Sequence, residues 1–282
     1  MSYSQVITRA NPTCILFLID QSGSMADPFP AGRKSKSTAL ADAINNLLRN
    51  LSLKCTKEDG IRDYYHIGVI GYSGDTVKSA FGGKLANEYE YLFSISEIAD
   101  NPYRIEERLK SEDDGAGGIF QKKIKFPIWF EPSANGGTPM CKAFKKAHSI
   151  LADWVKQYPN SFPPVVMNFT DGESTDGNPT LDAQTLQKLA TNDGNVLVFN
   201  AHLSSTKSVP ILYPDNETIL PDKYANLLFN ISSRLPSRLR EFAQDLGLQV
   251  SVNSKGFVLN AELVDIIHFL SVGTPAAQEY YS

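Results

Sequence analysis

The most pronounced pattern in the chain is a series of short, uninterrupted apolar runs separated by amphipathic stretches. The first run, from Cys14 to Ile19, ends at Asp20 and is typical of a strand buried on both faces. Further buried strands are predicted at 65–72, 164–170 and 196–201, an antiparallel edge strand at 76–81, and a final edge strand at 256–259.

Apolar residues between these runs recur at helical spacing. A first helix is predicted from the stripe Leu40, Ile44, Leu47, Leu48 and Leu51. A second opens at Gly136-Gly137-Thr138-Pro139 and carries an apolar stripe from Met140 to Trp154. Shorter helices are expected at 102–110, 181–190, 223–232 and 236–247. For the closing helix we expect Asn260 as the cap, Gly273 beyond the end, and an inward face of Leu263, Ile266, Ile267 and Leu270.

Strands that alternate with helices predict a three-layer, Rossmann-like α/β fold. Its sheet would be mostly parallel, with an antiparallel edge strand and helices on both faces. No repeat or linker divides the chain, so we expect a single domain, 1–282, with elaborations at about 83–133 and 205–256. In the first elaboration, interpreted as an insertion or hairpin, the aromatic segment 126–130 is expected to pack onto the core.

Composition excludes several classes of function. The chain has 27 Lys and Arg against 31 Asp and Glu, a net charge of −4, which gives no electrostatic case for nucleic acid or an anionic membrane surface. No apolar run is long enough to span a bilayer, and residues 1–13 lack a secretory pattern. Because Cys14, Cys55 and Cys141 lack pairing spacing, we expect packed, reduced thiols and a cytoplasmic location.

Oxygen-bearing side chains stand at the ends of two predicted strands and at one helix start. Asp20, Ser22 and Ser24 follow the first strand at alternate positions, so their oxygens can converge in a tight loop. One carboxylate and two hydroxyls suit Mg²⁺ or Mn²⁺, and the lack of a nearby thiol or imidazole disfavours zinc. Thr138 opens the second long helix, and Asp171 ends the strand at 164–170.

Together these segments resemble the metal-ion-dependent adhesion site of von Willebrand factor A-type (VWA) domains. The matching residues, in the family's order, are Asp20-Gln21-Ser22-Gly23-Ser24, Gly137-Thr138-Pro139 and Thr170-Asp171-Gly172. The resemblance covers about 12–204 and the closing helix. It implies direct metal binding by Ser22 and Ser24, and binding by Thr138, Asp20 and Asp171 either directly or through water.

The resemblance also implies a function, that of a metal-dependent protein–protein interaction module or adaptor. In such a module the ion binds a Glu or Asp of a partner protein. The missing secretion signal and disulfides favour the intracellular prokaryotic type, whose partners include kinases, phosphatases and ATPases. We therefore expect binding rather than catalysis, with no catalytic residue.

Two alternatives remain. A metal-dependent phosphoester hydrolase would need a general acid or base beside the ion, and the sequence identifies none. Asp20 after a strand also resembles the aspartate of haloacid dehalogenase-type phosphatases. Those enzymes need a second aspartate two residues later as a general acid, and this chain has Ser22 at that position. The other alternative is a structural interaction protein whose metal is incidental.

Overall fold

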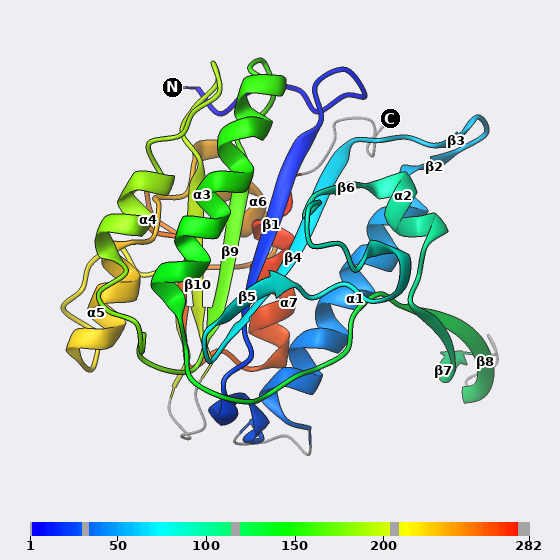
Figure 1. Ribbon diagram of the computed structural model, residues 1–282, viewed down its shortest axis with the longest axis horizontal. Helices are drawn as coiled ribbons and strands as arrows, with labels where there is room; N and C mark the ends of the chain where they lie inside the picture. The colour runs from blue at the N-terminus through cyan, green and yellow to red at the C-terminus, as the bar shows by residue number, and fades with distance from the viewer. Residues whose placement is uncertain (1, 30–33, 114–118, 204–208, 276–282) are drawn as a thin grey trace.

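The computed structural model describes residues 2–29, 34–113, 119–203 and 209–275. Its central sheet contains β1 (Thr13–Asp20), β4 (Tyr65–Ser73), β5 (Thr76–Ser79), β6 (Phe93–Ser94), β9 (Val165–Thr170), β10 (Leu197–His202), β11 (Ile211–Leu212) and β12 (Phe257–Leu259). The strand order is β11-β12-β10-β9-β1-β4-β5, with β6 also paired to β4 (Figure 1). Pairing is parallel from β12 to β4, whereas β5, β6 and β11 are antiparallel to their neighbours. The predicted, mostly parallel sheet with an antiparallel edge is confirmed.

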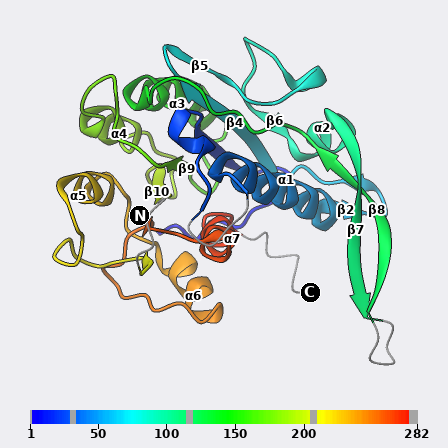
Figure 2. The ribbon, with the colours of Figure 1, turned by 90° about the horizontal axis from the view of Figure 1, so that it is seen from below.

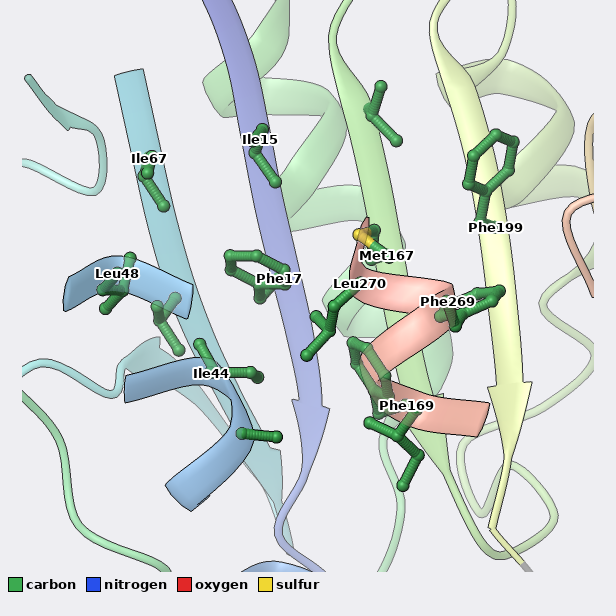
Figure 3. Close-up of a cluster of buried hydrophobic side chains, with 14 of the residues drawn as sticks. Ile15, Phe17, Ile44, Leu48, Ile67, Met167, Phe169, Phe199, Phe269 and Leu270 are labelled. Atoms are coloured by element: carbon green, nitrogen blue, oxygen red, sulfur yellow. The ribbon is translucent and has the colours of Figure 1, made fainter. Parts of the chain in front are cut away.

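Helices cover both faces of this sheet. One core contains side chains of α1 (Lys36–Cys55), α2 (Ile95–Asp100), α6 (Ser237–Asp245) and α7 (Leu263–Val272). The other contains side chains of α3 (Met140–Gln157), α4 (Thr180–Leu186) and α5 (Lys223–Asn230). Figure 3 shows the first core, in which Phe17 of β1 lies between Leu48 of α1 and Leu270 of α7. The three-layer α/β architecture is therefore confirmed.

Strand β1 is central because its side chains serve both cores. Ile15, Phe17 and Ile19 point into one core, and Leu16 and Leu18 into the other. Every residue of the strand is buried, as expected for a strand flanked by parallel neighbours and covered on both faces. The three cysteines are also buried and free, which agrees with the predicted packing role.

The first elaboration contains a long hairpin instead of the predicted helix at 102–110. Strand β7 (Arg104–Asp113) pairs antiparallel with β8 (Ile119–Ile128), and the hairpin extends past α1 and α2 in Figure 2. The helix prediction was wrong because pairing between the two strands outweighs the helix propensity of the segment. Across the hairpin, the Arg108 guanidinium lies 3.8 Å from the centre of the Phe126 ring. It also forms an ion pair with Asp42 of α1. The glycine-bearing part of the turn, 114–118, lies outside the described residues.

The aromatic segment that follows β8 packs inward, as predicted. Phe126, Ile128, Trp129 and Phe130 are all buried. The Trp129 indole N–H donates to the Ile98 carbonyl of α2, and its backbone N–H donates to Asn45 of α1.

A small hairpin of β2 (Thr56–Lys57) and β3 (Gly60–Ile61) follows α1, and the 3₁₀ turns η1 (Gly23–Ala26) and η2 (Gly83–Leu85) follow β1 and β5.

Three predictions for the last third were wrong in whole or in part. Strand β12 is not an edge strand, because the two-residue β11, too short for a sequence pattern, pairs outside it. Helix α7 is capped by Glu262 with Asp265, whereas Asn260 adopts a positive φ of 55° ahead of the helix. The buried face of the helix consists of Ile266, Phe269, Leu270 and Val272, whereas Leu263 is 43% and Ile267 is 46% exposed. Gly273 ends the helix as predicted.

Among the residues that the structure describes, no helix combines the length and the apolar character that crossing a bilayer requires.

Candidate metal centre

Asp20 lies at the carboxyl end of β1 with a fully buried side chain. One carboxylate oxygen accepts from the Ser22 backbone N–H at 2.8 Å, and the other accepts from the Thr170 hydroxyl at 2.7 Å. Burial raises the pKa of Asp20, although the hydrogen bonds from Ser22 and Thr170 act in the opposite direction. A carboxylate held in this environment favours a nearby cation, because a cation compensates for the lost hydration.

The two serines continue from Asp20 toward the surface. Ser22 precedes η1, and its hydroxyl makes no capping bond to that turn. The Ser22 and Ser24 hydroxyl oxygens are 3.1 Å apart, and the Ser24 hydroxyl donates to Asp171 at 2.7 Å. Ser22 is buried and Ser24 is exposed, so the row of oxygens runs from the interior to the solvent. The predicted convergence of these three residues with Asp171 is present in the structure.

Thr138 is placed beside the serines by the two glycines that precede it. Gly136 has a φ of +76°, and its carbonyl accepts from the Gly23 N–H at 2.9 Å, which ties this segment to η1. The position of the Thr138 hydroxyl follows from Gly172, where an added Cβ would lie 3.7 Å from Thr138 Oγ1 and 3.9 Å from Ser24 Oγ. Thr138 therefore borders the same small space as Ser24 and Asp171.

Lys36 is the residue that sequence reasoning missed. It is the first residue of α1, and its ammonium lies 2.5 Å from Asp171 Oδ2. Only 2% of the Lys36 side chain and 0% of the Asp171 side chain is exposed. The only signal in the sequence is the basic run 33–36 at the start of a helix, which reads as a solvated segment. The structure thus places the buried ammonium group of Lys36 against Asp171, which is a predicted metal ligand.

A layer of polar side chains lies beneath and beside these residues. The Tyr72 hydroxyl donates to Asn168 at 2.7 Å, and Asn168 donates to Asn200, so the ends of β4, β9 and β10 are joined. Nearby, the Tyr224 hydroxyl and His202 Nδ1 are buried without a hydrogen-bond partner. Burial raises the pKa of Tyr224 and lowers that of His202, which keeps both side chains uncharged at neutral pH. Unpartnered buried polar atoms beside two carboxylates are typical of a site that holds water or an ion.

The five candidate ligands form a donor set suited to a hard divalent ion. Two carboxylates and three hydroxyls supply only hard oxygen atoms, which suit Mg²⁺ or Mn²⁺ and leave room for water ligands. In the part of the chain that the structure describes, no group of three or more His, Cys, Asp or Glu side chains could hold a metal. A divalent ion here would therefore depend on the serine and threonine hydroxyls. The predicted residues fit the predicted ion.

Asp176 fixes the segment that carries Thr138, and its removal should be measurable. Its carboxylate accepts from the backbone N–H groups of Cys141 at 3.0 Å and Lys142 at 2.9 Å, in the first turn of α3. Because these groups have no partner within the helix, Asp176→Ala is expected to lower the free energy of unfolding by about 1–2 kcal/mol. Urea unfolding at pH 7 measures this, with the exposed Asp153→Ala on the same helix as a control expected to change by less than about 0.5 kcal/mol.

The contribution of Asp176 should also depend on pH. Burial opposes its ionisation, yet the hydrogen bonds from Lys142, Cys141 and Ser174 outweigh burial and lower the pKa of Asp176. A carboxyl whose pKa is lower in the folded state stabilises the protein above its ordinary pKa of about 4, and this stabilisation is lost as the pH falls further. The difference between wild type and Asp176→Ala should therefore shrink on acidification. An unchanged difference at pH 3 would contradict this role.

Comparison with known proteins was made by sequence and by structure. No family model matches the sequence. No curated protein matches it either. Among solved structures, the pilus adhesin SpaC from Lactobacillus rhamnosus GG is 12% identical with a TM-score of 0.42, and the match covers 95% of this chain but 30% of the adhesin.

Two further structures are similar at the same level. The vWF domain of the type V pili tip protein Mfa5 from Porphyromonas gingivalis is 13% identical, with a TM-score of 0.31 and coverage of 58% of this chain and 39% of that chain. The SpRpn10 VWA domain is 12% identical, with a TM-score of 0.36 and coverage of 70% and 77%. Likenesses this distant carry no information on ligands or partners, so the functional argument rests on the site itself.

Proposed function

We propose that this chain is a metal-dependent protein-interaction module of the VWA type. Asp20, Ser22, Ser24, Thr138 and Asp171 would hold Mg²⁺ or Mn²⁺, and the ion would bind a Glu or Asp of a partner protein. The observation that supports this is the convergence of these side chains from three segments into one set of contacts. Five ligand groups, some acting through water, leave a coordination position for an outside oxygen.

The burial pattern supports an ion that is approached from one side. Asp20, Ser22 and Thr138 are buried, whereas Gly23 and Ser24 are exposed. An ion held among these residues would therefore contact solvent near η1, at the lower edge of the sheet in Figure 1. Hydroxyl ligands add no charge, so the ion keeps its attraction for a carboxylate. Kinases, phosphatases and ATPases as partners, and a cytoplasmic location, belong to this proposal through the resemblance alone.

Replacing Asp20 tests the proposal. Asp20→Ala is expected to abolish binding of Mg²⁺ in calorimetry and of Mn²⁺ in electron paramagnetic resonance, because it removes one of two carboxylates. Proteins captured from a native lysate in Mg²⁺ should be lost both in EDTA and with Asp20→Ala. Asp27→Ala is the matched control, since Asp27 lies in the same loop, is exposed, and uses its backbone carbonyl to accept from the Lys36 N–H. Proteins retained equally in Mg²⁺ and EDTA would contradict the proposal and favour an incidental metal.

His202 provides the observation for a second candidate, a metal-dependent phosphoester hydrolase. It lies close enough to Asp171 and Lys36 for their charges to act on its pKa, and burial keeps it uncharged, as a general base must be. A hydrolase predicts turnover of a generic phosphoester that both Asp20→Ala and His202→Ala abolish. The interaction module predicts no turnover in any of these proteins.

A further inference from the structure

We propose that Lys36 is the resident cation of the metal-free site, and that its ammonium must leave Asp171 before a divalent ion can bind there directly. The inference rests on the proposed function only in taking the five predicted side chains as the metal ligands. It concerns the residue that sets the affinity of the site for a divalent ion, and the resemblance to VWA domains says nothing about that residue.

Both carboxylate oxygens of Asp171 are already engaged. Oδ1 accepts from the Ser24 hydroxyl at 2.7 Å, and Oδ2 faces the Lys36 ammonium. The two charged side chains are almost completely buried, so neither is screened by solvent as a surface ion pair would be. An ion coordinated directly by Asp171 would therefore lie next to the Lys36 ammonium, in a region that solvent does not screen.

The chain places Lys36 here against the local preference of the helix. A lysine in the first turn of a helix faces the positive end of the helix dipole, and α1 has no acidic residue in that turn. The position is nevertheless well defined. Ser35 caps the helix by accepting from the Thr38 N–H, and the Lys36 N–H donates to the Asp27 carbonyl at 2.9 Å. The bond to Asp27 holds the start of α1 beside η1, where Lys36 meets Asp171, and this ion pair offsets the unfavourable position.

The charge balance indicates competition. Asp20 and Asp171 together carry two negative charges, which balance one divalent ion. With Lys36 retained, three positive charges would share the same buried region with two negative ones, and repulsion between like charges is strong at low dielectric. Without a metal, the ammonium neutralises Asp171. The ammonium and the divalent ion therefore compete for one carboxylate, and Lys36 lowers the metal affinity.

Removing the charge of Lys36 tests this inference. Lys36→Met keeps most of the unbranched side chain without the charge, and Lys36→Gln retains a hydrogen-bond donor if the methionine variant does not fold. Either variant is expected to bind Mg²⁺ and Mn²⁺ about 10–100-fold more tightly than wild type, measured by calorimetry and electron paramagnetic resonance. In EDTA the melting temperature should fall, because Asp171 loses its counter-ion, and saturating Mg²⁺ should raise it more than in wild type.

Two controls isolate the charge at this position. Lys34→Met removes a lysine two residues earlier whose ion pair with Asp42 is exposed, and it should leave the metal affinity unchanged. Lys36→Arg retains the charge and should bind metal as weakly as wild type. Equal or weaker metal binding by both uncharged variants would overturn the inference, while the Mg²⁺-dependent capture of partners by wild type would still support the proposed function. If neither wild type nor the uncharged variants bind metal, the proposed function fails, and the inference with it.

Discussion

Replacing Asp171 by alanine is expected to lower the free energy of unfolding by about 3–5 kcal/mol, even in EDTA, because the buried Lys36 ammonium loses its carboxylate. Urea unfolding followed by circular dichroism measures this change. The cost does not depend on metal, so it separates the structural role of the ion pair from the role of Asp171 as a ligand. The same variant should fail to bind Mg²⁺.

A surface pair and a double variant serve as controls. Asp75→Ala removes a carboxylate that pairs with Lys142 and is 99% exposed, so its effect should stay below about 1 kcal/mol. Combining Lys36→Met with Asp171→Leu removes both charges and should restore most of the stability that Asp171→Ala loses. A loss in Asp171→Ala no larger than in Asp75→Ala would show that the pair does not behave as a buried one.

Trp129→Ala is expected to lower the free energy of unfolding by about 3–5 kcal/mol. Trp129 is 1% exposed and joins the end of β8 to α1 and α2, so truncation leaves a cavity and removes the indole's hydrogen bond to the Ile98 carbonyl, which keeps its bond from the Asn101 N–H. Urea unfolding followed by circular dichroism is the measurement. Leu109→Ala is the control, because Leu109 lies on the same hairpin, is 65% exposed, and should change stability by less than about 0.5 kcal/mol.

This second prediction also tests whether the hairpin is joined firmly to the sheet domain. If Trp129→Ala costs no more than Leu109→Ala, the aromatic segment contributes little to folding, and its burial would not represent core packing. The metal affinity of Trp129→Ala should equal that of wild type, because Trp129 contacts none of the proposed ligands. A coupled loss of metal binding would indicate that the hairpin positions α1 and Lys36.

The central strands and the proposed ligands could be predicted because their signals are local. An uninterrupted apolar run such as 14–19 needs cover on both faces, and parallel strands bring their carboxyl ends to one edge of a sheet. Asp20 and Asp171 were therefore expected at the same edge of the sheet, and the direct pairing of β1 with β9 brings them close. The glycines before Thr138 allowed a tight approach, and the structure shows the Gly23 N–H bound to the Gly136 carbonyl.

The predictions that failed depended on partners distant in the sequence. The segment 104–110 has helix-forming residues, yet β8 supplies its hydrogen bonds and Asp42 its salt bridge. Strand β11 has only two residues, so pairing with β12 alone defines it. The buried face of α7 is set by its packing in the core shared with α1 and α6, which the spacing of apolar residues does not reveal.

The sequence by itself determined the α/β alternation, the burial of β1 on both faces and the identity of five oxygen-bearing candidates, since each is encoded in a short pattern. Only the tertiary structure decided what surrounds them. Lys36 and Asp171 are 135 residues apart in the sequence. A lysine in a basic run is expected to be solvated, and only the folded structure shows that this one is shielded from water. A buried charge acquires its role from its partner, and the pairing of distant residues is a property of the whole fold.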